Sequence, residues 1–435
     1  MKLLLRGFIY RVLFTVIGFL ISLLIAKLAG ASQFGTLSLI IVNAAFISII
    51  TGLGTDAAIV WHGISDKNYS RDKMFSFTVI TAAIQLLFFY IIAILGYIFL
   101  GRTLLGGSYD LKIFFAEIVY FTGLVLMDKF LSLYYSQHEA QLCNKIISIV
   151  SAILLLSVLI IWMAEPGLIT THSIWIYSLF IFIPAFILSF FFIVKYNPAY
   201  KNISQEEMKS FSSFSSIVLI SNIIQFIAFR ADYWLINIFY NSHEVGVYAQ
   251  ASKFAQLLWI IPGILAGLIP PALKDQNQRL TNAELVSICK ISLFAHAILA
   301  FLLIIVAFLI YNFFLPLDYY KGFLPLLIMI PGYLLYTITI ILAGYFSANR
   351  LLKVNLFGSI LCCALILLFD LLFIPFLSYI GAAIANLIAY SVTTIYVIRR
   401  SKGKFSLSFK DLFNFKKSDF DLFLSRIIKT DNKDT

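Results

Sequence analysis

The residues of this sequence that could do chemistry are a few charged side chains inside long apolar runs. Three are cations and three are carboxylates: Arg11, Arg230, Lys253, Glu117, Asp128 and Asp232. A charge near the centre of a bilayer costs from about 3 to more than ~10 kcal/mol, so each should face protein or a watery cavity. There, arginine and lysine can form charge-assisted hydrogen bonds with an anion. These six are the candidate binding residues, and the sequence indicates no catalytic residue and no metal site.

Helical periodicity predicts how these side chains are grouped. At 100° per residue, Glu117 and Asp128 lie within about 20° of each other and form one acidic stripe. Arg230 and Asp232 point about 160° apart, so only one of them can line a given cavity. Lys253 lies at a depth that makes an Asp232–Lys253 pair feasible. For all these charges two readings stay open, a binding cavity or ion pairs that only make them tolerable in the membrane.

Three further charges are weaker candidates. Lys129 could snorkel to the cytoplasmic interface, and Asp56 is close enough to the end of an apolar run to be interfacial. Asp370 stands alone in its run without a visible partner.

Two Pro-Gly pairs mark places where the predicted helices could bend. Pro262-Gly263 and Pro331-Gly332 remove backbone hydrogen bonds within apolar runs, which makes these four residues hinge candidates. The alternative is a static kink, since prolines are common in membrane helices.

The elements that position these residues are predicted to be membrane-spanning helices. Hydrophobic residues make up 61% of the chain and charged residues 12%, against roughly 45–50% and 25% for soluble proteins. Twelve apolar runs can each cross about 30 Å of hydrocarbon. They cover residues 12–31, 36–58, 75–100, 113–135, 146–163, 174–194, 217–239, 247–270, 286–308, 323–346, 354–376 and 379–398. The sequence therefore predicts an all-α integral membrane protein.

The twelve runs divide into two tandem halves that correspond at an offset of 211 residues. Residues 34–37 match 245–248, Gly52 matches Gly263, and Asn144 matches Asn355. We expect an N-terminal lobe of six helices (1–194), a cytoplasmic linker (195–210) and a C-terminal lobe of six helices (211–400). A parallel repeat with a transport site at the lobe interface is typical of carriers. The basic tail, 401–435, is predicted to be an interfacial helix or a partly disordered segment.

Lysine and arginine predict the orientation in the membrane. With the N-terminus inside, 25 of them lie in inner segments and 4 in outer segments. This bias predicts that both termini are cytoplasmic. The net charge of +11 is therefore a topology signal with attraction to anionic lipid, and does not indicate nucleic-acid binding. The four cysteines have no metal-type spacing.

Several short motifs resemble those of a known transporter family. They are AGASQFG at 29–35 with GLGTD at 52–56, RAD at 230–232 with GVYA at 246–249 and Lys253, and YIGAAIA at 379–385. In order and spacing they resemble the polysaccharide-exporter branch (O-antigen-type, Wzx-like flippases) of the multidrug/oligosaccharidyl-lipid/polysaccharide (MOP) superfamily. The resemblance covers almost all of residues 1–400.

The resemblance implies a V-shaped pair of six-helix lobes and alternating access. The implied substrate is an undecaprenyl-diphosphate-linked oligosaccharide, moved from the cytoplasmic to the periplasmic leaflet of the bacterial inner membrane for O-antigen or capsule synthesis. Arg11, Arg230 and Lys253 would bind the diphosphate. Glu117 and Asp128 would balance those charges, bind a coupling cation or contact sugars. Implied partners are membrane lipids, a polysaccharide polymerase and a chain-length regulator. No cofactor is implied, and a coupling proton or sodium ion stays open.

Three other functions stay open. A cation-coupled drug antiporter of the same superfamily would favour an acidic cavity with little basic charge, which Arg230 and Lys253 oppose. A membrane-embedded polysaccharide polymerase or glycosyltransferase is disfavoured by outer loops of about a dozen residues at most. A scaffold in a polysaccharide assembly complex would tolerate the loss of its intramembrane charges. The sequence thus favours a transporter over an enzyme.

Overall fold

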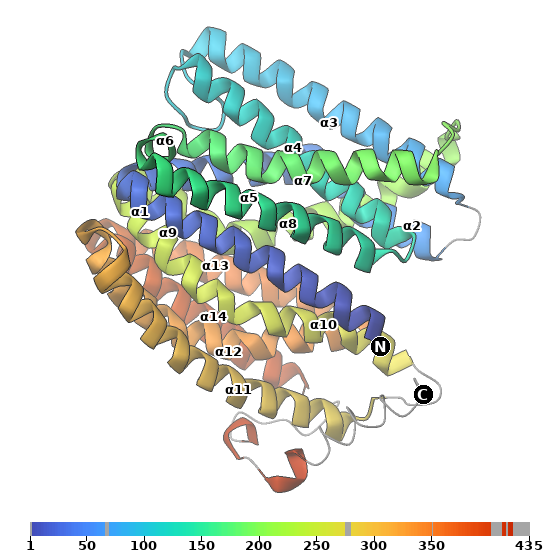
Figure 1. Cartoon of the computed structure of the whole chain (residues 1–435). Helices are drawn as coiled ribbons and strands as arrows, with labels where there is room; N and C mark the ends of the chain where they lie inside the picture. Colours follow the sequence, from blue (N-terminus) through green and yellow to red (C-terminus); the bar gives the residue numbers. More distant parts are fainter. Residues whose placement is uncertain are drawn as a thin grey trace. The chain divides into compact units, whose positions relative to one another are not determined.

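The structure is a computed structural model that describes residues 2–65, 69–274, 280–349, 351–401, 411–414 and 416–420. The chain divides into two compact units, Met1–Phe226 and Ile227–Thr435. Every regular element within the described ranges is a helix (Figure 1). The predicted all-α class is therefore confirmed.

The first unit holds seven helices and the beginning of an eighth. They are α1 (Lys2–Gly52), α2 (Thr55–Ser65), α3 (Arg71–Leu100), α4 (Leu111–Ser136), α5 (Ala140–Ala164), α6 (Pro166–Thr171), α7 (Ser173–Tyr196) and α8 (Gln205–Phe239). Helix α4 contacts α2, α3, α5 and α7, so it lies at the centre of this unit.

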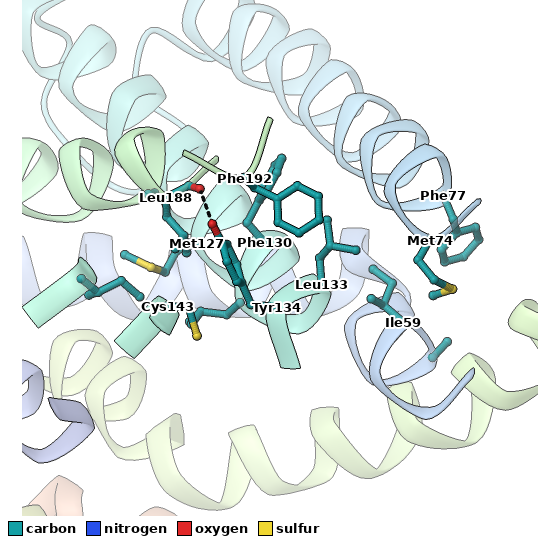
Figure 2. Close-up of a cluster of buried hydrophobic side chains, with 14 of the residues drawn as sticks. Ile59, Met74, Phe77, Met127, Phe130, Leu133, Tyr134, Cys143, Leu188 and Phe192 are labelled. Carbon is teal, nitrogen blue, oxygen red and sulfur yellow. Dashed lines mark hydrogen bonds between the residues drawn. The ribbon is translucent and has the colours of Figure 1, made fainter. Parts of the chain in front are cut away.

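Bulky side chains fix α4 in that central place. Figure 2 shows Phe130 and Tyr134 of α4 with Phe192 of α7, and the Tyr134 hydroxyl donates a hydrogen bond to the Leu188 carbonyl, 3.4 Å away. Gly123 brings the α4 backbone against α7, because a Cβ there would lie 2.6 Å from the Cα of Phe182. Within a membrane such contacts stabilise the unit through close van der Waals packing, since lipid tails are as apolar as these side chains.

The second unit continues with six further helices and several short turns. They are α9 (Ser242–Gln256), the 3₁₀ turn η1 (Leu257–Trp259), α10 (Ile260–Lys274), α11 (Asn282–Leu309), the π-helical turn η2 (Ile310–Phe314), the 3₁₀ helix η3 (Leu317–Gly322), α12 (Phe323–Ala348), α13 (Leu352–Leu377) and α14 (Tyr379–Ser401). Helix α12 contacts α9, α10, α11, α13 and α14, and so occupies the central place in its unit.

The twelve predicted spans are present as helices, six in each half. Eight helical stretches of the described residues are long and apolar enough to cross a membrane. The first of them, Ile9–Gly52, is 44 residues long, about twice the hydrocarbon thickness. Gly30, with φ 74°, breaks it, so it supplies two spans. The remaining three spans are α4, α8 and the α9–α10 pair, which carry five of the six charged candidates.

Two predicted spans are interrupted where the sequence suggested continuous helices. The span predicted at 36–58 is divided, because α1 ends at Gly52 and α2 begins at Thr55. The span predicted at 247–270 contains η1 just before Pro262. Pro262 lacks an N–H, so the preceding turn loses a hydrogen bond and tightens.

The segment between α7 and α8 and the first turn of α8 are bound to the N-terminal end of α3. Lys73 of α3 forms an ion pair with Glu207 at 2.6 Å, and the N–H of Lys201 donates to the Ser76 hydroxyl at 2.8 Å. Glu207 also caps α8 by accepting from the Ser204 N–H at 2.8 Å. The Lys73 hydrogen bond holds the pKa of Glu207 below its usual range.

Part of the basic tail docks on α11. Asp419 forms an ion pair with Lys290 at 3.1 Å, and Leu412 is fully buried among residues of α11 and α12. The interfacial helix is predicted from the spacing of Phe420, Phe423, Leu424, Ile427 and Ile428; of these, Phe420 is described and exposed, and the other four lie outside the described residues.

Candidate functional site

A cavity lined by both apolar and polar residues lies in the first unit where α1, α2, α4 and α8 meet. Its volume is about 220 Å³. The polar side chains that line it are Ser48 of α1, Asp56 of α2, Asp128 of α4 and Asn222 of α8. All four belong to the first unit, so the cavity is complete within one compact body.

The turn between α1 and α2 shapes this cavity. Leu53 has φ 51° and Gly54 has φ 70°, which reverses the chain after Gly52 and starts α2 at Thr55. A Cβ at Gly54 would lie 2.5 Å from the carbonyl oxygen of Ser215 in α8. Position 54 therefore requires glycine both for its backbone conformation and for its close approach to α8.

Lys129 is paired inside the protein and does not snorkel. Its side chain is 1% exposed, and its ammonium lies 2.9 Å from a carboxylate oxygen of Asp56 and donates to the Thr55 hydroxyl. The predicted snorkelling is wrong, because the α1–α2 turn brings a carboxylate to the ammonium. Asp56, a weak candidate by sequence, both neutralises Lys129 and lines the cavity.

Asp128 lines the same cavity, and its charged neighbours are Asp56, Lys129 and Arg11. The structure thus brings together two of the sequence candidates, Arg11 and Asp128. Arg11 is exposed, with its guanidinium 5.6 Å from the centre of the Phe14 ring.

Glu117 is not among the residues that line this cavity. This side chain is 3% exposed and organises the loop between α3 and α4. It accepts hydrogen bonds from the Thr103 hydroxyl at 2.8 Å and from the N–H groups of Leu105 and Gly107 at 3.3 and 3.1 Å. Although Glu117 shares a helix face with Asp128, its carboxylate is hydrogen-bonded to the loop between α3 and α4.

Two cations lie together in the second unit. Arg230 of α8 donates to the Gln256 side chain at 3.1 Å and to the Tyr233 hydroxyl at 3.3 Å. Arg230 is also the charged neighbour of Lys253 on α9. Both cations are half-buried. The structure therefore groups Lys253 with Arg230, whose charged neighbours also include Asp232.

Asp232 points to a different set of partners, as the helical angle predicts. Its carboxylate accepts hydrogen bonds from the Tyr248 hydroxyl and from the Asn386 amide at 3.2 Å. Asn386 also contacts the Tyr248 hydroxyl, 2.6 Å away. Sequence reasoning missed Asn386, although a lone amide in the apolar run 379–398 was an available signal.

Asp370 of α13 lies beside this group. It is fully buried, Asp232 is its charged neighbour, and neither of its oxygens has a hydrogen-bond partner among the described residues. The lone carboxyl noted in the sequence is thus a neighbour of a second carboxyl.

The four hinge candidates differ in their surroundings. Pro262 and Gly263 follow the 3₁₀ turn η1, and a Cβ at Gly263 would meet nothing within 4 Å. Pro331 and Gly332 lie within the continuous helix α12. A Cβ at Gly332 would lie 2.8 Å from the Cα of Leu387 in α14, so this glycine permits close helix packing.

Comparison with known proteins identifies both a family and a fold. The model of the family described as "Polysaccharide biosynthesis protein" matches residues 4–273, more than half of the chain. A search of curated proteins finds no match.

Solved structures with a similar fold are transporters. A lipid II flippase, MurJ in an inward closed conformation, matches with a TM-score of 0.72 and 16% identity, covering 98% of this chain and 96% of that one. An inward-facing multidrug resistance MATE transporter of the MOP superfamily matches with a TM-score of 0.63 and 14% identity, over 90% and 95%. A point mutant of the Vibrio cholerae MATE transporter VcmN has a TM-score of 0.57 and 16% identity, over 95% and 98%. The fold is that of MOP-superfamily transporters.

Proposed function

Because the chain belongs to the polysaccharide biosynthesis protein family, we propose that it is a flippase for lipid-linked oligosaccharides. It would move undecaprenyl-diphosphate-linked repeat units from the cytoplasmic to the periplasmic leaflet by alternating access, for O-antigen or capsule synthesis. The excess of lysine and arginine in the inner segments supports an inner-membrane protein with cytoplasmic termini.

The observation that carries this proposal is the neighbouring pair Arg230 and Lys253. Two like charges in a half-buried region repel each other, Asp232 offsets part of the charge of Arg230, and an anion with several charges relieves the remaining repulsion. A diphosphate offers such charge and many acceptor oxygens. The guanidinium can bind it through two parallel hydrogen bonds and the ammonium as a compact charge.

The cavity of the first unit supports a role in holding sugar. Asp128, Asn222 and Ser48 present acceptors and donors in one small space. Sugar hydroxyls both donate and accept, so a carboxylate beside an amide and a hydroxyl can bind them. Arg11, a neighbour of Asp128, would add a contact to the headgroup.

The test is the leaflet distribution of lipid-linked oligosaccharide in cells that lack this protein. We expect accumulation on the cytoplasmic side, cleared by the wild type but not by Arg230→Ala combined with Lys253→Ala. The matched control is Lys353→Ala combined with Arg399→Ala, which also removes two cations, both of them exposed. This control should clear the accumulation at equal expression. An unchanged lipid distribution on deletion would refute the flippase.

Two carboxyl groups, those of Asp56 and Asp128, line one small space and favour a second candidate, a cation-coupled drug antiporter, against the basic charge of the neighbouring Lys129 and Arg11. Drug susceptibility of the deletion strain separates the two functions. Raised susceptibility with a normal lipid distribution would favour the antiporter.

A further inference from the structure

An apolar groove with a single cation lies at one end of the second unit. Its volume is about 430 Å³, and α11, η2, η3, α12 and α14 contribute to it. Phe308, Phe323, Leu324 and Leu327 form apolar walls, and Lys321 lies among the lining residues. It is at the opposite end of α11 from Lys290, which binds the tail through Asp419.

Local backbone structure fixes this lysine in place. The π-helical turn η2 ends α11, and η3 then returns the chain to α12. Gly322 allows the two turns to pack closely, because a Cβ there would lie 3.0 Å from Cε1 of the buried Tyr311 ring. Lys321 is thereby held directly before α12.

The electrostatics of the groove favour an anion. Lys321 forms no ion pair within the described part of the chain. The first turn of α12, a 26-residue helix, adds the partial positive charge of a helix N-terminus beside it. Asp318, the other charged residue of η3, is not among the residues that line the groove. Lys321 is also one of only four cations in the outer segments of the sequence.

Apolar walls beside one cation fit a lipid with an anionic head. The exposed rings of Phe308 and Tyr320 suit the boundary between headgroups and chains, where aromatic residues gather. A single lysine balances the single charge of a phosphodiester. A diphosphate carries more charge, and the pair Arg230 and Lys253 suits it better.

We propose that this groove binds one anionic phospholipid, with its phosphodiester at Lys321 and an acyl chain along Phe308, Leu324 and Leu327. The positive-inside bias places this end of the unit in the outer leaflet. The site is separate from the proposed flippase site and does not depend on that function.

The test is native mass spectrometry of the purified full-length protein with phosphatidylglycerol, phosphatidylethanolamine or undecaprenyl phosphate. We expect phosphatidylglycerol to be retained over phosphatidylethanolamine, with Lys321→Gln lowering its retention on the order of fivefold. Lys112→Gln, which removes another exposed outer cation, is the matched control and should change nothing. Leu327→Trp, which fills the groove, should lower the retention of phosphatidylglycerol.

Equal retention of phosphatidylglycerol and phosphatidylethanolamine by the wild type would overturn the proposal, as would unchanged retention in Lys321→Gln. Retention of undecaprenyl phosphate above phosphatidylglycerol, lost in Lys321→Gln, would replace the phospholipid with the carrier lipid. Thermal unfolding of each variant verifies that it is folded. A variant that does not fold is replaced by Lys321→Met or Leu327→Phe.

Discussion

A fully buried lysine next to the cavity of the first unit depends on one carboxylate. Lys129 is 1% exposed, whereas the side chain of Asp56 is 37% exposed. The two partners therefore differ in what happens when the other is removed. Asp56 can be hydrated without Lys129, but Lys129 without Asp56 keeps a buried charge that has lost its ion-pair partner, with Asp128 acting on it only as a charged neighbour.

We expect Asp56→Asn to lower the free energy of unfolding by about 3–5 kcal/mol, because it leaves the buried ammonium unpaired. Lys129→Met should cost less, and the double substitution should resemble Lys129→Met alone. Thermal unfolding in detergent micelles ranks the three variants. Lys195→Met is the control, since it breaks the exposed pair with Glu139 and should cost under about 1 kcal/mol. Equal losses for Asp56→Asn and Lys129→Met would contradict this account.

Residue types singled out the charges within the predicted spans, but not the partners of those charges. The sequence placed Arg230 and Asp232 on different helix faces, and they do bind different side chains: Gln256 for Arg230, and Tyr248 and Asn386 for Asp232. The sequence also grouped Glu117 with Asp128, because helical periodicity relates only residues of the same helix. The loop that captures Glu117 folds back from preceding residues, and no periodicity within α4 contains that information.

At the scale of the helices, two Pro-Gly pairs that look alike in the sequence lie in different surroundings. Gly263 has open space around it, whereas Gly332 touches the backbone of α14. The difference depends on a helix more than fifty residues further along the chain. Sequence reasoning therefore could not separate a hinge from a packing contact at either pair.

We expect Gly332→Ala to destabilise the protein by about 1–3 kcal/mol, because the new methyl group would overlap the Cα of Leu387. Gly263→Ala should be neutral or stabilise the helix by up to ~1 kcal/mol. Thermal unfolding compares the stability of the two variants, and a lipid translocation assay compares their activity. Full stability of Gly332→Ala with loss of translocation would instead support the hinge at this position.

For the whole molecule, composition and the offset of 211 residues were sufficient to predict twelve helices in two halves. Equivalent asparagines in the two halves make equivalent contacts. Asn144 accepts from the Tyr135 hydroxyl at 3.2 Å, and Asn355 donates to the Ser347 hydroxyl at 3.0 Å, so each contacts the end of the preceding helix. The division at Gly52–Gly54 was not predicted, because Leu53 adopts a positive φ and Gly54 packs against Ser215 of α8, about 160 residues further along the chain.

Helix α8 is shared between the compact units. Its early residues complete the first unit: Phe211 stacks on Phe77 with ring centres 3.9 Å apart, and Ser215 contacts Gly54. A fragment of residues 1–202 would lack both and expose the core shown in Figure 2. A fragment of residues 1–240 would keep them.

We expect fragment 1–240 to elute as a single species in size-exclusion chromatography, and fragment 1–202 to aggregate. Equal behaviour of the two fragments would show that α8 is dispensable to the first unit. In terms of gene architecture, the boundary between the two sequence repeats is not the boundary at which the folded protein can be divided. The part of the gene that encodes the first repeat must include the codons for the start of α8 in order to encode a folded unit.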